Sequence, residues 1–134
     1  MKQYSHPGKD RLKKISMFKQ LASFRYAFNG IKILLKEEQN ARIHLFIAVC
    51  VLIAGLVLKI STIEWIAVIF CIGLVFALES INSAIENTVD LYSKEQNDLI
   101  KKIKDLSAGA VLFAVISSVI IGLIVFLPKL CRWF

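Results

Sequence analysis

Three long apolar runs, separated by short polar segments, organise the chain. They cover residues 43–58, 63–78 and 106–127, and the third is the longest. A helix that crosses a bilayer needs about 20 mainly apolar residues. The third run reaches this length unaided, whereas the first two need flanking residues at each end. The pattern predicts an all-α integral membrane protein with three transmembrane helices, over about residues 41–58, 63–90 and 105–127, the second extending beyond the bilayer.

A further helical pattern precedes these runs. Apolar residues recur there at steps of four and three between cations: Met17, Leu21, Phe24, Phe28, Ile31 and Leu35, with Lys19, Arg25, Lys32 and Lys36 interleaved. Such a pattern is typical of an amphipathic helix on a membrane surface, although a helix packed on the bundle would share it. We expect this helix over about residues 17–36, a basic flexible tail over residues 1–15, and a single domain over residues 16–134.

Composition agrees with a membrane protein and limits it to one small domain. The chain has 134 residues, of which 57% are hydrophobic, and ordinary soluble domains are less apolar than this. Cys50, Cys71 and Cys131 show neither CxxC spacing nor a metal-ligand pattern. We therefore interpret the cysteines as small apolar residues.

The distribution of cations predicts how the chain is oriented. Ten of the 17 Lys and Arg residues precede the first apolar run, and four more lie between the second and third runs. Because cytoplasmic segments carry the excess of Lys and Arg, we expect the N-terminus and a loop over residues 93–104 to be cytoplasmic. The turn at residues 59–62 and the C-terminus would then lie outside. Beside three spans, a net charge of +7 indicates contact with anionic lipid rather than nucleic acid.

A polar stripe runs straight out of the second apolar run. At about 100° per residue, Glu79, Ser83, Glu86 and Asp90 share one helix face, with Asn82 on its flank. Carboxylates at the edge of a bilayer are costly, and like charges on one face repel. A site that holds a divalent cation and a general base needs such a cluster.

A second polar cluster, residues 36–44, directly precedes the first span. It could simply mark a helix boundary, with glutamates in a first turn. In the functional interpretation, Glu38, Asn40 and Arg42 form a half-site that faces the polar stripe. His44 lies one turn further into the apolar run, where it either holds a carboxylate or is a satisfied polar residue.

Nucleotide chemistry is one interpretation of these clusters. The chain has no G-x-x-x-x-G-K-S/T or G-x-G-x-x-G phosphate loop, so any bound phosphates would need a metal held by carboxylates. Glu38 and Glu86 could hold Mg²⁺, Lys104 could offset developing charge, and Glu79, the deepest carboxylate, could act as general base. A proton-coupled transporter with a glutamate in a span and a non-catalytic membrane protein whose stripe pairs with neighbouring cations remain open alternatives.

Three motifs resemble those of the prokaryotic diacylglycerol kinase family. Residues 79–90 resemble its E-x-x-N-S/T-A-I-E-x-x-x-D signature, residues 104–110 its Lys-Asp motif, and the Glu38-x-Asn40-x-Arg42-x-His44 cluster its N-terminal motif. The resemblance covers about residues 18–130. It implies a homotrimeric lipid kinase of the bacterial cytoplasmic (inner) membrane, with sites shared between protomers, that transfers the γ-phosphoryl group of Mg-ATP to a lipid hydroxyl.

The resemblance also assigns residues to roles. It implies Glu79 as catalytic base and Glu38 and Glu86 as Mg²⁺ ligands. The implied ATP-binding residues are Lys19, Tyr26, Glu38, Glu86, Asp90, Glu95, Gln96, Asn97, Lys104 and Asp105, and the residues lining the lipid or active site are Asn40, Arg42, Glu79, Asn82 and Ala108. The N-terminal motif, residues 61–65 and residues 124–130 resemble the Gram-positive branch. We therefore expect undecaprenol as the substrate, with diacylglycerol as the alternative.

Overall fold

The computed structural model describes the backbone of residues 7–92 and 97–131, and side chains over 22–91 and 97–131. In these ranges the chain forms helices α1 (Pro7–Glu37), α2 (Gln39–Val57), α3 (Thr62–Tyr92) and α4 (Asp98–Leu130), and no strand. Helices α2, α3 and α4 are each long and apolar enough to cross a membrane. The predicted fold class, all-α with three transmembrane helices, is confirmed.

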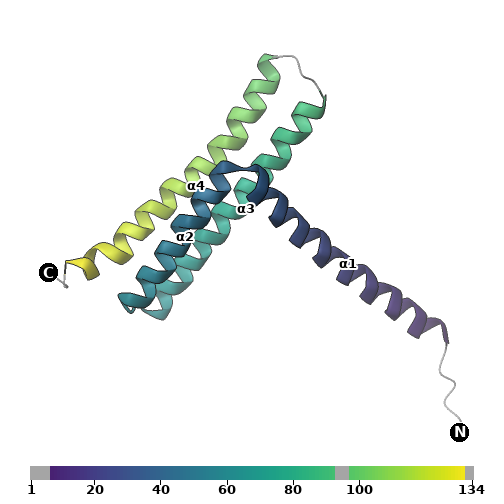
Figure 1. The fold of residues 1–134 in the computed structure, drawn as a ribbon, viewed down its shortest axis with the longest axis horizontal. Coiled ribbons are helices and arrows are strands. Elements are labelled where there is room, and N and C mark those ends of the chain that lie inside the picture. Colours follow the sequence, from purple (N-terminus) through teal and green to yellow (C-terminus); the bar gives the residue numbers. More distant parts are fainter. Residues whose placement is uncertain (1–6, 93–96, 132–134) are drawn as a thin grey trace, which may run out of the picture.

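The three apolar helices form one bundle from which α1 departs. Helices α3 and α4 form a long antiparallel pair, α2 packs on α3, and α1 points away from the bundle (Figure 1). On α1, the side chains of Phe24, Phe28 and Ile31 are exposed, whereas Leu34 is buried near the junction with α2. This arrangement agrees with a surface helix whose apolar residues lie in lipid.

Two helices begin earlier than the sequence pattern predicted. Helix α1 starts at Pro7 rather than near Met17, so the predicted tail was too long; its residues 1–6 lie outside the described range. A proline suits the first helical position, because its missing N–H is not needed there. Helix α4 starts at Asp98, so the predicted loop was wrong from residue 98 onward. The side chain of Asn97 caps this helix by accepting a hydrogen bond from Leu99 N at 3.0 Å.

The turn between α2 and α3 is closed by local contacts. Lys59 takes a positive φ of 49°, and its N–H and that of Ile60 donate to Leu56 O and Gly55 O, which is the Schellman termination. Gly55 also lets α3 approach, because a Cβ there would lie 2.9 Å from the ring of Trp65. This end of the bundle holds a small core of Ile60, Val68 and Val125.

The start of α3 is fastened both to itself and to α4. The Ser61 N–H donates to Oε2 of Glu64 at 2.6 Å, and the Glu64 N–H approaches Ser61 Oγ at 3.4 Å, which is a capping box. The same Oε2 of Glu64 forms an ion pair with Lys129 Nζ at 3.0 Å. One carboxylate therefore joins the first turn of α3 to the last turn of α4.

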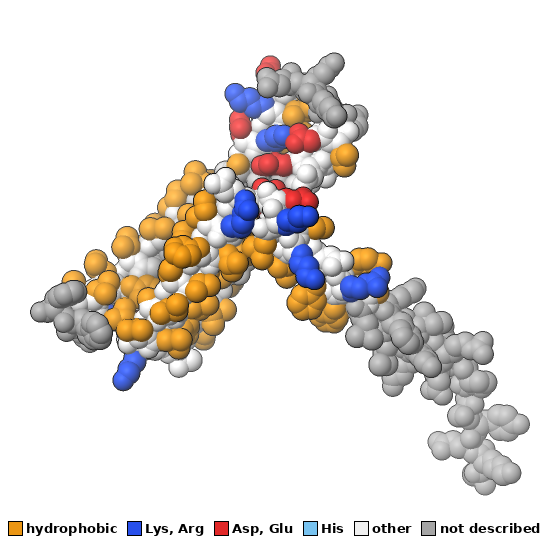
Figure 2. Space-filling view, in the orientation of Figure 1, with side chains coloured by type: hydrophobic (Ala, Val, Ile, Leu, Met, Phe, Trp, Pro, Cys, Tyr) orange, Lys and Arg blue, Asp and Glu red, His pale blue; other side chains and the backbone are white. Residues whose placement is uncertain are grey.

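Charged and apolar side chains are segregated on the surface. Acidic and basic groups gather at the end of the bundle where α1 meets α2 and where α3 and α4 extend furthest, while apolar side chains cover the remainder of the visible bundle (Figure 2). Large residues such as Phe46, Phe70 and Phe113 are about two-thirds to three-quarters exposed. Exposed apolar surface of this extent indicates contact with lipid or with other chains.

Candidate active site

The site begins at a break between two helices. Glu38 lies between α1 and α2 in an extended conformation, with φ −96° and ψ 119°, and its N–H still donates to Leu34 O. The extended backbone turns the side chain away from both helix axes and toward α3. There Oε1 of Glu38 accepts a hydrogen bond from Ser83 Oγ at 2.7 Å. This bond shows that Glu38 and the polar stripe meet within one chain.

Glu79 is the buried carboxylate of the site. Its side chain is only 3% exposed, although it lies on the long helix that leaves the apolar bundle. The Asn40 side chain lies beside the carboxyl group, and His44, Glu38 and Glu86 are further polar neighbours. A carboxylate held away from water beside an amide partner can accept a proton from an alcohol.

A chain of hydrogen bonds connects α4 to the second carboxylate. Ser107 Oγ on α4 donates to Asn82 Oδ1 at 2.6 Å, and Asn82 Nδ2 donates to Glu86 Oε1 at 2.9 Å. Ser107 Oγ also lies 3.0 Å from Lys104 O within its own helix. The direct partners of Glu38 and Glu86 therefore both lie on α3, and Ser107 adds a contact from α4 to the Asn82 amide.

An ion pair lies at the outer rim of the site. Lys104 Nζ on α4 and Asp90 Oδ1 on α3 are 2.5 Å apart, and both groups are accessible to solvent. On the same face of α3, Asp90 lies about one helix turn beyond Glu86 and about three turns beyond Glu79. The Lys104 ammonium group therefore lies at the same end of the bundle as the carboxylates, where Asp90 holds it in place.

The carboxylates suit a hard cation that also binds phosphate. Glu38 and Glu86 each accept one neutral side-chain hydrogen bond on Oε1, which leaves each carboxylate further acceptor capacity. Among the described residues, no group of three or more His, Cys, Asp and Glu is placed to hold a metal. Two carboxylates fit Mg²⁺ nonetheless, because this ion commonly binds through one or two carboxylates and completes its shell with water and phosphate.

The other predicted residues lie at differing distances from this cluster. Among the described side chains, Arg42, Asp105 and Ala108 are exposed, and Asn97 serves as the cap of α4. Tyr26 is exposed beneath the Arg25 guanidinium, and twelve residues of helix, about 18 Å, separate it from Glu38. Glu95 and Gln96, and the side chain of Lys19, lie outside the described part of the chain. The roles of these residues stay predictions.

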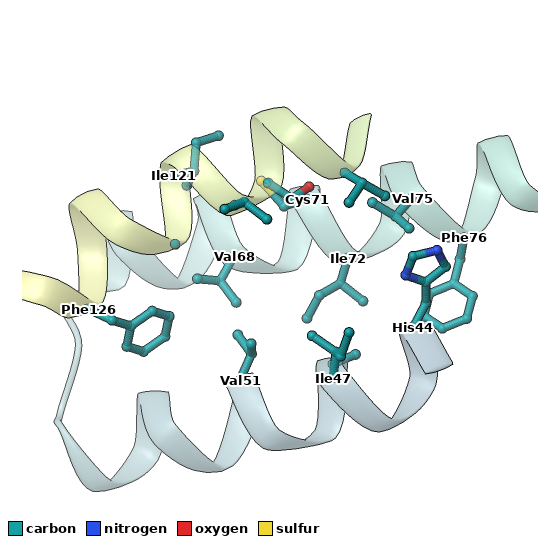
Figure 3. A pocket seen from close by; sticks show the side chains of 15 residues that line it. His44, Ile47, Val51, Val68, Cys71, Ile72, Val75, Phe76, Ile121 and Phe126 are labelled. Carbon is teal, nitrogen blue, oxygen red and sulfur yellow. The ribbon is translucent and has the colours of Figure 1, made fainter. Parts of the chain in front are cut away.

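Two serines and a cavity were not anticipated as parts of the site. Ser83 lies on the polar stripe without a predicted role, and Ser107 lies within the Lys-Asp motif of residues 104–110 without one. Their small polar side chains at the helix contacts were the available signal. Below the site, an apolar cavity opens between α2, α3 and α4, with His44 at one end (Figure 3). Its lining comes from three helices, and the pattern of apolar residues along the sequence does not show how three helices pack together.

Comparison with known proteins identifies the family. Residues 25–126 match the prokaryotic diacylglycerol kinase family. Undecaprenol kinase of Bacillus subtilis is 42% identical over 92% of this chain and 98% of the relative. Diacylglycerol kinases of Synechocystis and Haemophilus influenzae are 40% and 34% identical, over 82% and 69% of this chain and 63% and 78% of the relatives.

These relatives agree on one class of chemistry. Undecaprenol and diacylglycerol are both lipid alcohols, so kinases of either are phosphotransferases with an alcohol as acceptor. The match covers the polar stripe, the Lys-Asp motif and the Glu38 cluster. The resemblance inferred from these three motifs and the predicted enzyme class are thereby confirmed: the chain belongs to the prokaryotic diacylglycerol kinase family.

Proposed function

We propose that the chain is an ATP-dependent lipid kinase that phosphorylates undecaprenol. The observation that carries the proposal is the position of Glu79, buried where the apolar bundle ends and flanked by Glu38 and Glu86. The undecaprenol kinase of Bacillus subtilis, similar along nearly its whole length, supports the choice of lipid. Diacylglycerol is the alternative acceptor, supported by the names of the other two relatives.

In the proposed reaction, the lipid hydroxyl oxygen attacks the γ-phosphorus of ATP. The new oxygen–phosphorus bond forms as the bond between the γ-phosphorus and the β,γ-bridging oxygen breaks, and ADP leaves. Glu79 accepts the hydroxyl proton as this charge moves. Lys104, oriented by Asp90, offsets negative charge on the phosphates from the rim.

Glu38 and Glu86 are the residues that would hold Mg²⁺. When bound, the ion supplies positive charge that neutralises the phosphate oxygens. The protein contributes by fixing both carboxylates, since Ser83 orients Glu38 and Asn82 orients Glu86. Both orienting side chains lie on α3, so the positions of the two carboxylates are set by the same helix.

We further propose a homotrimer with sites shared between protomers. Supporting this, apolar surface is broadly exposed on the bundle, and α1 carries Tyr26 away from the cluster of its own chain. A neighbouring protomer could then receive α1 beside its own Glu38. Native mass spectrometry of the detergent-solubilised protein tests the trimer: a mass of one or two chains would contradict it.

For orientation, we propose that the end of the bundle carrying the site is cytoplasmic. ATP is cytoplasmic, and the cations between residues 22 and 42 and at residues 101–104 belong to segments that meet or begin at this end. The turn at Lys59 and the C-terminus would face outward across a bacterial cytoplasmic membrane. Labelling of a single cysteine placed at Lys59 by an impermeant thiol reagent in intact cells tests this orientation.

The test of function is direct phosphoryl transfer. The purified protein in mixed micelles receives γ-labelled Mg-ATP with undecaprenol or diacylglycerol in parallel. We expect labelled lipid, with faster transfer to undecaprenol. Faster transfer to diacylglycerol would favour the alternative substrate, and no transfer to either lipid would contradict the proposed kinase.

A further inference from the structure

The apolar cavity between α2, α3 and α4 has a volume of about 230 Å³. Figure 3 shows Val51, Val68 and Ile72 facing one another across it, with His44 and Phe76 at one end and Phe126 at the other. Along α3 its lining runs from Val68 to Phe76, which is roughly 12 Å at 1.5 Å per residue. The cavity is therefore elongated along the helix axes.

The cavity leads toward the buried carboxylate. On α3, Val68, Ile72 and Val75 follow one face at helical spacing, and the next position on that face is Glu79. On α2, the lining residue His44 is a neighbour of Glu79 and lies one turn from Asn40, another neighbour of Glu79. The lining residues of α2 and α3 therefore lead from the cavity to Glu79.

The chemistry of the lining selects an apolar occupant with one polar end. Ser118 lines the cavity, but its hydroxyl already donates to Ala114 O at 2.7 Å. His44 is the polar ring of the lining, and it lies at the end toward Glu79. An alcohol on a long hydrocarbon chain matches this order of polar and apolar surface.

We propose that this cavity holds the part of the acceptor's chain nearest its hydroxyl, and that it accepts one chain rather than two. The proposal rests on the lipid kinase function proposed above and names how the site selects its substrate. An apolar cavity of about 150 Å³ holds one benzene, so 230 Å³ accommodates a single short chain segment. A polyprenol presents one chain at its hydroxyl end, whereas diacylglycerol presents two.

Gly122 is the glycine of the cavity lining. A Cβ built there meets no atom within 4 Å, so a leucine can enter without backbone strain and occupy the space. Gly73 is the matched control: it lies in α3 with equally open surroundings and is not part of the lining. The two variants add the same side chain inside and outside the cavity.

The experiment compares Gly122→Leu with Gly73→Leu on undecaprenol and on prenol itself, whose single isoprene unit is too short to run the length of the cavity. Gly122 lies one helix turn from Phe126, at the end of the cavity away from His44, so prenol ends before it. Displacing about two methylene groups from an apolar site weakens binding roughly tenfold. We therefore expect Gly122→Leu to raise the KM for undecaprenol about tenfold, with the KM for ATP and the rate with prenol kept. Gly73→Leu should match wild type with both acceptors.

Two results would overturn the inference: an unchanged KM for undecaprenol in Gly122→Leu, or an equal loss with the long and the short acceptor. The smaller Gly122→Val replaces the leucine variant if the latter fails to elute at the wild-type size. Failure of wild type to phosphorylate any alcohol would instead contradict the proposed kinase. In that event, cross-linking by a polyprenol with a photoreactive group near its hydroxyl still decides the inference, since cross-links must map to the cavity lining.

Discussion

Ser107 on α4 fixes the orientation of the Asn82 amide on α3. Its hydroxyl donates to Asn82 Oδ1 at 2.6 Å, so the amide presents its N–H group to Glu86 Oε1 at 2.9 Å. With Oδ1 occupied by a donor, the reversed amide would place an acceptor beside the carboxylate. A serine that touches neither nucleotide nor lipid in the proposed reaction therefore acts as a positioning residue for a proposed metal ligand.

Removing this hydroxyl should weaken the affinity of the enzyme for Mg²⁺. We expect Ser107→Ala to raise the Mg²⁺ concentration for half-maximal activity about tenfold, as loss of outer-shell partners of metal ligands commonly does. Ser107→Thr should restore much of the affinity because it keeps the hydroxyl. Ser117→Ala is the control, since the Ser117 hydroxyl donates to Phe113 O in its own helix. Identical Mg²⁺ titrations for Ser107→Ala and wild type would contradict the positioning role.

Glu79→Gln tests the proposed general base. The substitution keeps the size of the buried side chain and an acceptor for Asn40 while removing the proton-accepting carboxylate. We expect phosphoryl transfer to fall about 10²- to 10⁴-fold, the usual contribution of a general base. ATP affinity, measured by equilibrium binding, and the elution volume of the assembly should stay unchanged. Turnover at the wild-type rate would remove Glu79 from this role.

Glu38→Ala and Glu86→Ala test the two proposed metal ligands. Each should raise the Mg²⁺ requirement strongly, because Mg²⁺ bound through two carboxylates loses half of its protein ligands. Glu37→Ala is the matched control, since Glu37 is an exposed carboxylate adjacent to Glu38. Activity is followed over a Mg²⁺ titration after removal of bound metal with EDTA. If both variants titrated like wild type, the shared-metal arrangement would be wrong.

The features that the sequence predicted well are those repeated along one helix. Three apolar runs gave the three spans, and the spacing of Glu79, Ser83, Glu86 and Asp90 placed them on one face of α3. Both inferences need only helical periodicity, because each uses residues from a single continuous element. The same holds for the family resemblance, whose motifs are contiguous.

Features that depend on contacts between helices were beyond this reasoning. The bond from Ser83 to Glu38 requires the extended backbone at Glu38 between two helices, which a polar cluster does not reveal. The link from Ser107 to Asn82 joins residues 25 positions apart on different helices. The start of α4 was missed for another reason: a single cap at Asn97 outweighed the polar composition that had suggested a loop.

The ion pair between Glu64 and Lys129 should act cooperatively with the capping box. Oε2 of Glu64 accepts from both Ser61 N and Lys129 Nζ, so Glu64→Gln disturbs two interactions whereas Lys129→Met removes one. We expect Glu64→Gln to lower the thermal midpoint in detergent more than Lys129→Met does. The double variant should lose less than the sum of the two. Strict additivity would show that the pair makes no coupled contribution.

Gly55 is required by the close approach of α2 and α3. A Cβ at this position would lie 2.9 Å from Cη2 of Trp65 and 3.1 Å from Cδ1 of Ile60, whereas at Gly73 it would meet nothing within 4 Å. Overpacking of this kind costs about 1–3 kcal/mol, so Gly55→Ala should lower the free energy of unfolding in mixed micelles by this amount. Gly73→Ala should be neutral or stabilising by up to about 1 kcal/mol, because alanine is the better helix former. Since both substitutions add one methyl group within a span, the difference between their effects isolates the contact with Trp65. Equal effects would mean that the helices separate at no cost, and the turn at Lys59 alone would then hold α2 against α3.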